Sequence, residues 1–350
     1  MALYPRRLQR LGTTTLVVSL PKQWAAERRL KPGDVVYIEV NGDRLTIYSR
    51  EVAQEPTAAI ISADEVEKPE ILARIVASCF LQGHDIVKVT SNLGLTESQT
   101  QAILATVEWL PGFEVVEQTP RQIVLQAIID PTKFKIEAVI RRLNVLVISM
   151  MGVAVDTLVR GVSEKVGEVL DTGKKLEELY HMAVRQLIIA LKNPSVAHSV
   201  GIDSPIAVLG YRLVAKAIEE AGQHAISLAK ESLHVRHKGI TIKKSIVNKL
   251  VSIAEEVQTL FTNSVNAFLT LDLKMVNSVL DSLQGMMDTI ETTERELIEE
   301  VDDAELSLSL RVSLMHFSAI LDAVKTISEV ALNKFVRMST NIVQVATASQ

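Results

Sequence analysis

The chain has very little cysteine, which limits where and how it can fold. Cys79 is the one cysteine among 350 residues, so no disulfide can form within the chain. This excludes a small secreted scaffold held together by disulfides and suits a reducing cytosol. We therefore expect a cytoplasmic protein.

The sequence also lacks a recognisable targeting or membrane segment. The residues before Arg6 do not carry the apolar core of a signal peptide. The most apolar run, 145–155, is interrupted by Ser149 and Gly152, and it is too short to span a bilayer. We expect no membrane insertion.

Motifs of common catalytic sites are missing as well. We find no nucleophile elbow, zinc-protease motif or glycine-rich dinucleotide fingerprint. Residues 167–175 resemble a phosphate loop, but they have one residue too many between the glycines and no Ser or Thr after the lysine. They are predicted to lie in a linker and the start of a helix. These absences predict that the chain is not an enzyme.

The histidines do not form a recognisable metal motif. His234 and His237 are three residues apart near a predicted helix end, where cationic side chains cap carbonyl groups, and no third ligand accompanies them. His198 is predicted to lie in a loop. We expect capping at the first two positions and no partner for the third.

Acidic residues are scarce in only one part of the chain, the first 50 residues. This segment holds nine basic and four acidic side chains, a net charge of +5. The whole chain carries −5, which leaves −10 on the remaining 300 residues. A basic segment on an otherwise acidic chain indicates a polyanionic partner, because phosphate contacts supply most non-specific affinity for nucleic acid.

The basic segment has the pattern of a small β module. Apolar and β-branched runs at 14–20, 35–40 and 45–48 predict strands, and Asn-Gly before the last run predicts a hairpin turn. Between the first two runs a short helix is predicted, with Ser19 able to cap it and Pro21 in its first turn. A β-β-α-β-β unit of this size cannot bury a core alone, so an intertwined dimer is expected.

Three stretches, 6–12, 16–24 and 30–35, resemble the SpoVT/AbrB swapped-hairpin family of DNA-binding domains. The resemblance implies that two chains interleave their hairpins and present arginines from the first strand and its turn to double-stranded DNA. At position 13 this chain has threonine where bacterial members often carry arginine. The same fold also serves as a pure dimerisation element, so both roles stay open. The candidate DNA-binding residues are Arg6, Arg7, Gln9, Arg10, Thr13, Lys22 and Arg28.

After a linker at 51–57 the pattern predicts a small α/β domain over 57–130, with the order β-α-β-α-β-β. Gly83, Gly94 and Pro111-Gly112 separate its elements. The predicted strands are 58–62, 86–90, 113–118 and 122–128, and the predicted helices are 69–81 and 96–110. Cys79 is expected on a buried helix face, and the domain's residues name no ligand.

Residues 131–350 have a helical pattern. Ile136, Val139, Ile140, Leu143 and Val147 have the spacing of a buried stripe. Breaks near 161, 193–194, 203–205, 238–239 and 272 divide the region into about six long helices. Short links between six helices predict two three-helix bundles, at about 131–236 and 240–345.

Two stretches in this region, 219–229 and 318–328, resemble the signature helix of the PhoU family of phosphate-uptake regulators. In that helix, two carboxylates spaced i, i+4 ligate metal, and the family consists of tandem three-helix bundles. The resemblance implies that Glu219, Gln223 and Asp322 are candidate metal ligands. Each stretch has lost one carboxylate of its pair, so we expect no tightly held metal and no cofactor.

A third feature of the helical region is acidic. Residues 288–305 hold nine acidic side chains and one basic one, Arg295. They are predicted to form a solvated helix face, with Leu297, Ile298, Val301 and Leu306 on the buried side. The alternative is an acidic surface that docks a basic protein partner or weakly holds divalent ions.

The two resemblances together match an arrangement described for predicted phosphate-uptake regulators of archaea. The sequence therefore predicts a multidomain chain, with a swapped-hairpin module at 1–52, an α/β domain at 57–130 and PhoU-like bundles at 131–350. The expected function is a homodimeric, cytoplasmic DNA-binding transcriptional regulator of phosphate uptake or a related transport response. One alternative is a PhoU-like adaptor that binds a transporter or kinase and uses the basic module only to dimerise. Another is an architectural DNA-coating protein.

Overall fold

The structure is a computed structural model that describes residues 4–41, 44–49, 56–130, 133–160, 163–237, 242–338 and 342–343. The chain divides into two compact units, Met1–Pro56 and Thr57–Gln350. The second unit contains both the small α/β domain and the helical region.

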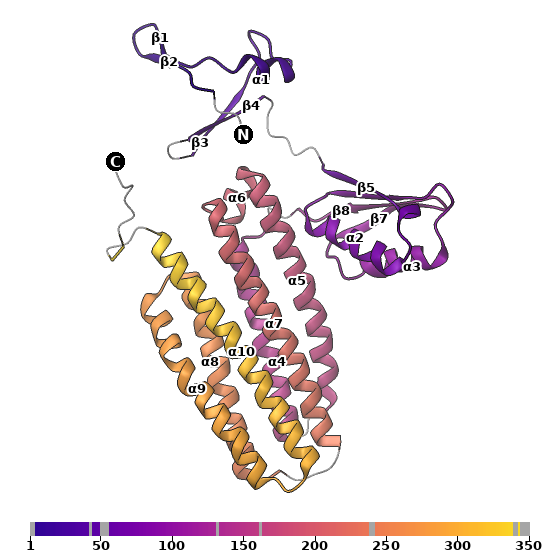
Figure 1. The fold of residues 1–350 in the computed structure, drawn as a ribbon, viewed down its shortest axis with the longest axis vertical. Coiled ribbons are helices and arrows are strands. Elements are labelled where there is room, and N and C mark those ends of the chain that lie inside the picture. The colour runs from indigo at the N-terminus through magenta and orange to yellow at the C-terminus, as the bar shows by residue number, and fades with distance from the viewer. Residues whose placement is uncertain are drawn as a thin grey trace. The chain divides into compact units, whose positions relative to one another are not determined.

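The first unit has the expected β-β-α-β-β order (Figure 1). Strand β1 pairs antiparallel with β2, and β3 pairs antiparallel with β4. Its elements are β1 (Gln9–Leu11), β2 (Thr15–Val17), α1 (Lys22–Glu27), β3 (Tyr37–Asn41) and β4 (Arg44–Tyr48).

Two local predictions in this unit were wrong. The strand expected over 14–20 is confined to Thr15–Val17, since its partner β1 is only three residues long. Ser19 does not cap the helix, because α1 begins after Pro21, which takes the N-cap position without a side-chain hydrogen bond.

Gly12 has φ +69° in the turn between β1 and β2, a conformation that glycine adopts without strain.

The α/β domain is a four-stranded sheet with two helices on one face (Figure 1). The strand order is β5-β6-β8-β7, with β5 and β6 parallel and the other pairs antiparallel. Its elements are β5 (Ala58–Ser62), α2 (Pro69–Leu81), β6 (Ile86–Thr90), α3 (Glu97–Val107), β7 (Phe113–Thr119) and β8 (Gln122–Ala127). The expected β-α-β-α-β-β order is confirmed.

Alternation of apolar residues explains this sheet. Val87 and Val89 of β6, and Ile123 and Leu125 of β8, are fully buried beneath α2 and α3. Helix α3 begins where Thr96 forms a capping box with Gln99, which satisfies backbone N–H groups that a helix start leaves unpaired. Cys79 is only partly buried.

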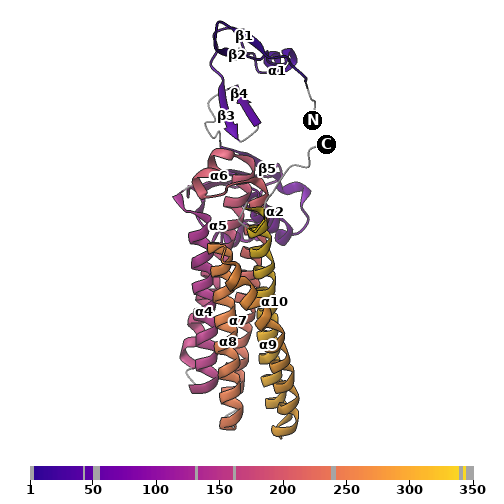
Figure 2. The same cartoon turned by 90° about the vertical axis from the view of Figure 1, so that its left-hand side faces the viewer.

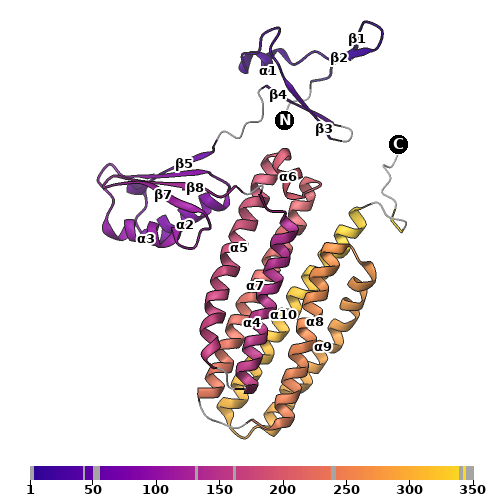
Figure 3. The same ribbon diagram turned by 180° about the vertical axis from the view of Figure 1, so that it is seen from behind.

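The helical region consists of two three-helix bundles whose long helices run along a common direction (Figure 2). Helices α4, α5 and α7 form the first bundle, and α8, α9 and α10 form the second. Helix α7 packs on α10, and α4 packs on α8 (Figure 3). The buried side chains of the two bundles form one hydrophobic core. The helices are α4 (Ile136–Arg160), α5 (Val166–Lys192), α6 (Pro194–Val200), α7 (Pro205–His237), α8 (Lys244–Thr270), α9 (Leu273–Glu300) and α10 (Ala304–Arg337).

Three local predictions in the helical region need correction. His198 is not in a loop, because Asn193 caps a short helix, α6, that contains it. Residues 167–175 lie entirely within α5, since Gly173 packs against Ile226 of α7 rather than opening a loop. The segment 288–305 is not one helix, because α9 ends at Glu300 and Asp303 caps the start of α10.

Two described helices are long and apolar enough to cross a membrane by length and composition alone, at Ile136–Val159 and Ala304–Arg337. The run 145–155 is too short by itself, but the helix that contains it is longer. In the structure Leu143 and Val147 of the first helix, and Leu314 and Val324 of the second, are fully buried in the bundle core. Packing between helices therefore explains their apolar character.

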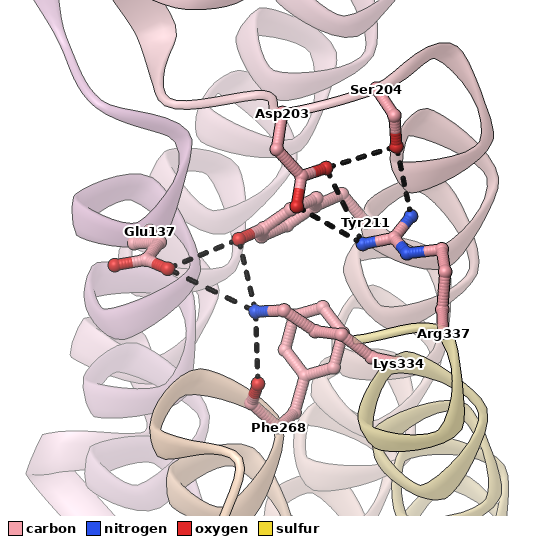
Figure 4. Close-up of polar contacts among 7 residues, drawn as sticks. All are labelled: Glu137, Asp203, Ser204, Tyr211, Phe268, Lys334 and Arg337. Carbon is pink, nitrogen blue, oxygen red and sulfur yellow. Dashed lines mark hydrogen bonds and ion pairs between the residues drawn. The ribbon is translucent and has the colours of Figure 1, made fainter. Parts of the chain in front are cut away.

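A half-buried polar network connects the bundles at one end (Figure 4). Tyr211 of α7 donates to Glu137 of α4 at 3.1 Å. Lys334 of α10 donates to Tyr211 at 3.3 Å and to the carbonyl oxygen of Phe268 at 3.1 Å, at the end of α8. Burial lowers the pKa of Lys334, and the nearby Glu137 opposes this shift. The network joins four helices, so it fixes how the bundles meet.

Candidate functional site

The seven predicted DNA-binding side chains are all exposed on the first unit. Arg6 and Arg7 precede β1, Gln9 and Arg10 lie in it, and Thr13 lies in the following turn. Lys22 opens α1, and Arg28 follows its last residue. Arg6 contacts Tyr4, whose ring centroid is 5.9 Å from the guanidinium carbon.

No carboxylate pairs with Arg6, Arg7 or Arg10 among the residues that the structure describes in this unit. Arg6 donates to the carbonyl oxygen of Pro5 at 3.1 Å, a contact that leaves its charge uncompensated. Unpaired exposed arginines have donors available for phosphate oxygens. The strand and turn around Gly12 thus carry the basic side chains that a nucleic acid could contact.

The same unit exposes a continuous apolar face. Ile38 lies opposite Ile47, and Val40 lies opposite Leu45, so the four side chains share one face of the β3–β4 hairpin. Ile38, Val40 and Leu45 are 57%, 72% and 64% exposed. None of the described side chains of this unit is buried. An apolar sheet face of this kind normally contacts another surface.

The structure brings together only two of the three predicted metal ligands. Glu219 of α7 is buried and accepts hydrogen bonds from Lys216 at 2.6 Å and from Gln223 at 3.1 Å. Asp322 lies on α10 with an exposed side chain, and in the part of the chain that the structure describes no hydrogen bond joins it to the other two. The described residues include no cluster of three His, Cys, Asp or Glu side chains that could hold a metal.

The ammonium group of Lys216 supplies the positive charge beside Glu219 that a metal ion would otherwise supply. Burial lowers the pKa of Lys216, but the hydrogen bond and charge of Glu219 outweigh it, so the pKa is raised overall. Burial and the charges of Glu219 and Glu178 raise the pKa of Glu177. Lys216 and Glu219 are three residues apart, a spacing that favours an ion pair on a helix. The sequence could therefore have predicted this pair, but the resemblance to a metal motif drew attention to Gln223 instead.

The predicted acidic surface is divided between α9, the link after it and the start of α10. Ile298 is 59% exposed, so its assignment to the buried side was wrong, whereas Leu297 and Leu306 are buried. Ile298 directly follows Leu297 on the helix, and the two side chains point about 100° apart. A groove of about 550 Å³ lies between α8 and α9. Its lining includes Ile253, Met286, Glu256, Asp288 and Glu296, and Lys249, also in the lining, forms an ion pair with Glu296.

His234 contacts another helix. Its Nε2 lies 3.4 Å from a carboxylate oxygen of Glu305 on α10. His237 is the last residue of α7, as predicted. Glu305 lies on a different helix from His234, so the spacing of residues along the sequence could not identify it as the partner.

The contact between the α/β domain and the helical region was not predicted. Arg185 of α5 is buried and donates to the carbonyl oxygens of Phe80 and His84 and to the carboxylate of Asp85, each at 2.8 Å. Lys192 donates to the carbonyl oxygen of Gln82 at 2.6 Å. Two cations of α5 therefore cap the carboxyl end of α2, where the helix dipole favours positive charge.

Two further contacts join the α/β domain to helix α5. The rings of Trp109 and His181 lie 5.0 Å apart, and burial lowers the pKa of His181. Gly83 has φ +85°, and a Cβ at this position would come within 2.9 Å of Ile189. The close approach of α2 to α5 thus requires glycine here.

Comparisons with known proteins agree with this architecture. Residues 140–232 match the PhoU domain family, and residues 9–55 match the family described as antidote-toxin recognition MazE, bacterial antitoxin. A search of curated proteins gave no match.

Two solved structures are similar to the chain. PhoU from Pseudomonas aeruginosa is 17% identical, with a TM-score of 0.52, over 58% of this chain and 95% of that one. The phosphate transport system regulatory protein PhoU from Streptococcus pneumoniae is 14% identical, with a TM-score of 0.46, over 56% and 91% of the two chains. The first likeness shows that the helical region has the PhoU fold. The chain thus joins a MazE/AbrB-type module to a PhoU-like region.

Proposed function

We propose that this chain is a cytoplasmic, dimeric DNA-binding regulator whose PhoU-like half controls how its amino-terminal module reaches DNA. The observation that supports this proposal best is the first unit, which combines unpaired exposed arginines with an uncovered apolar hairpin face. The apolar face fits a second copy of the module in a swapped-hairpin dimer. Such a dimer doubles the basic surface. The likeness of the helical region to PhoU makes phosphate uptake, or a related transport response, the regulated process that we favour.

Arg6 and Arg10 are expected to contact DNA phosphates. Replacing both by alanine should weaken binding to duplex DNA by roughly 10- to 100-fold and lower the salt slope by about 3.6, because a dimer loses four phosphate contacts and each lost contact removes about 0.9 from that slope. A band-shift titration at several salt concentrations measures both quantities. The matched control is the double replacement by lysine, which keeps the charge and should keep the slope. An unchanged affinity and slope in the alanine variant would show that the strand does not bind DNA.

Genome-wide recovery of DNA bound to the chain tests the function itself. We expect discrete sites, as a regulator requires. Uniform coverage would support an architectural DNA-coating protein. No recovery would support the PhoU-like adaptor, which the acidic groove between α8 and α9 favours because it suits a basic segment of a protein partner.

The purified chain is expected to hold no stoichiometric metal at Glu219, Gln223 or Asp322. Lys216 already neutralises Glu219, and a bound cation would have to displace it. Elemental analysis after purification without chelator should find far less than one equivalent of iron, manganese or zinc per chain. One equivalent or more, lost in Glu219→Gln or Asp322→Asn, would contradict this prediction.

The helical half is expected to alter DNA binding without touching DNA. The region after residue 50 carries −10, so a duplex repels it while the basic module attracts the same duplex. A fragment of residues 1–56 and the full chain should therefore differ in affinity, salt slope or preferred half-site spacing on the same DNA. Identical behaviour of the two, with and without candidate effectors, would exclude regulation by this route.

A further inference from the structure

A pair of histidines also joins the two helical bundles, and neither histidine is part of the polar network drawn in Figure 4. His224 lies on α7 in the first bundle, and His316 lies on α10 in the second. Their Nδ1 atoms are 3.2 Å apart, and their ring centroids are 5.4 Å apart. Both side chains are half-buried. His224 lies within the stretch 219–229 but is not one of its candidate ligands, and His316 lies outside both stretches that resemble the PhoU signature helix.

The spacing of the two nitrogens fits one edge of a tetrahedral metal site. Two nitrogen ligands at the usual distance from zinc, on a tetrahedron, lie about 3.3–3.4 Å apart. The observed 3.2 Å differs from this by no more than the tolerance expected of a metal site. The 5.4 Å between centroids shows that the rings point nearly at one another, as in an N–H···N hydrogen bond. Rotation of each ring by roughly 35° would turn that hydrogen bond into a shared metal position at the tetrahedral angle.

We propose that His224 and His316 form a two-histidine site for a borderline divalent cation such as Zn²⁺, which bridges the two bundles. Imidazole nitrogen is a preferred ligand of zinc. Because the described residues contain no group of three His, Cys, Asp or Glu around one point, water or an exogenous ligand completes the coordination. Such a site exchanges its metal readily. It is therefore consistent with a chain that is metal-free after purification.

The protonation chemistry suits this ligand. Imidazole binds metals in its neutral form. In the metal-free pair one Nδ1 carries the shared proton and the other accepts it. When a cation binds, the donor imidazole carries its proton on Nε2 instead, and both Nδ1 lone pairs point to the metal. No proton is lost overall.

The site is separate from the predicted carboxylate site. His224 follows Gln223 in sequence, but consecutive side chains on a helix point about 100° apart. Glu219 and Gln223 bond to each other and to Lys216, whereas His224 reaches across to α10. A cation held by the histidines would link α7 to α10 and so stabilise the relative position of the bundles, whether or not the chain binds DNA.

Zinc titration of the tag-free full chain tests the proposal. Isothermal calorimetry in a non-chelating buffer should show about one equivalent of Zn²⁺ per chain, and zinc should raise the unfolding temperature. His224→Gln and His316→Gln should each weaken zinc binding at least about tenfold and remove the thermal shift, since each variant removes one of the two protein ligands. Glutamine keeps a polar side chain at the contact between α7 and α10. The unfolding temperature without zinc checks that both variants fold.

Two matched controls identify the site. His234→Gln changes the histidine that pairs with Glu305, and Glu219→Gln changes the carboxylate beside Lys216. Both should bind zinc as the unaltered chain does. Absence of zinc binding up to millimolar concentration, or equal binding in both His224→Gln and His316→Gln, would overturn the proposal and leave a hydrogen-bonded pair. Loss of binding only in Glu219→Gln would overturn it in favour of the carboxylate site.

Discussion

Replacing Arg185 by methionine is expected to lower the free energy of unfolding by about 3 kcal/mol and to release the α/β domain from the bundles. The guanidinium is buried and makes three contacts, two to carbonyl oxygens at the end of α2 and one to Asp85. Methionine fills much of the same volume but donates no hydrogen bond. The loss leaves the carbonyl oxygens of Phe80 and His84 without these donors.

The expected cost lies at the lower end of the range for broken buried ion pairs, because the side chain of Asp85 is 37% exposed and water can reach it. Asp85 also accepts a hydrogen bond from the backbone N–H of Thr57 at 2.9 Å, which fixes the start of β5. We therefore expect faster hydrogen exchange at the carboxyl end of α2 and around β5, together with a lower unfolding temperature. Exchange in α8 and α9 should change little.

Lys192 offers the matched control for the contact between α5 and the α/β domain. It caps the same helix end but is exposed, and its contact with the carbonyl oxygen of Gln82 lies at the surface. Lys192→Met should cost no more than about 1 kcal/mol. If Arg185→Met unfolds like the unaltered chain and exchanges hydrogen at the same rates, the buried arginine does not hold the domains together.

The elements of the α/β domain could be predicted from the sequence because their signals are local. Alternating apolar residues and the breaks at Gly83, Gly94 and Pro111 fix where each strand and helix begins and ends. Five of its six predicted elements end within one residue of the observed ones, and only the helix predicted over 96–110 is shorter, at Glu97–Val107. The helical stripe that begins at Ile136 is likewise local, and its residues are buried as expected.

The contacts that determine how the parts act together could not be predicted in this way. Arg185 is 100 residues from Asp85, and His224 is 92 residues from His316. Arg185 lies in an ordinary helical pattern, and neither histidine is among the residues that the resemblance to the PhoU family singles out. Only the packing of α5 on α2, and of α7 on α10, brings the partners together. Glu219 is the opposite case, because its partner is close in sequence. Its carboxylate, which resembles part of a metal motif, accepts a hydrogen bond from Lys216, three residues away.

Replacing Val40 and Leu45 together by threonine is expected to dissociate the proposed dimer of the amino-terminal module and to weaken DNA binding by more than 100-fold. The two residues lie directly opposite each other on the β3–β4 hairpin and are 72% and 64% exposed in the single chain. Threonine retains the preference for strands, so the hairpin should still form. What it removes is apolar surface.

The expected size follows from four substituted side chains in each dimer. Losing the burial of roughly 1–2 kcal/mol for each of them weakens association by at least about 1000-fold. DNA binding falls with it, because one module presents half of the basic surface and can contact only one half-site. The loss should exceed that caused by Arg6→Ala and Arg10→Ala together. Sedimentation velocity measures the oligomeric state, and a band-shift titration measures the affinity for DNA.

Ile60 of β5 gives the matched control, since it is an exposed apolar strand residue at 74% exposure in the other unit. Ile60→Thr should leave both the oligomeric state and DNA binding unchanged. If Val40→Thr with Leu45→Thr leaves a dimer that binds DNA normally, the hairpin face does not form the dimer contact that DNA binding needs. A chain that remains dimeric but no longer binds DNA would show instead that the helical half dimerises by itself, while the hairpin face pairs the two modules on the duplex.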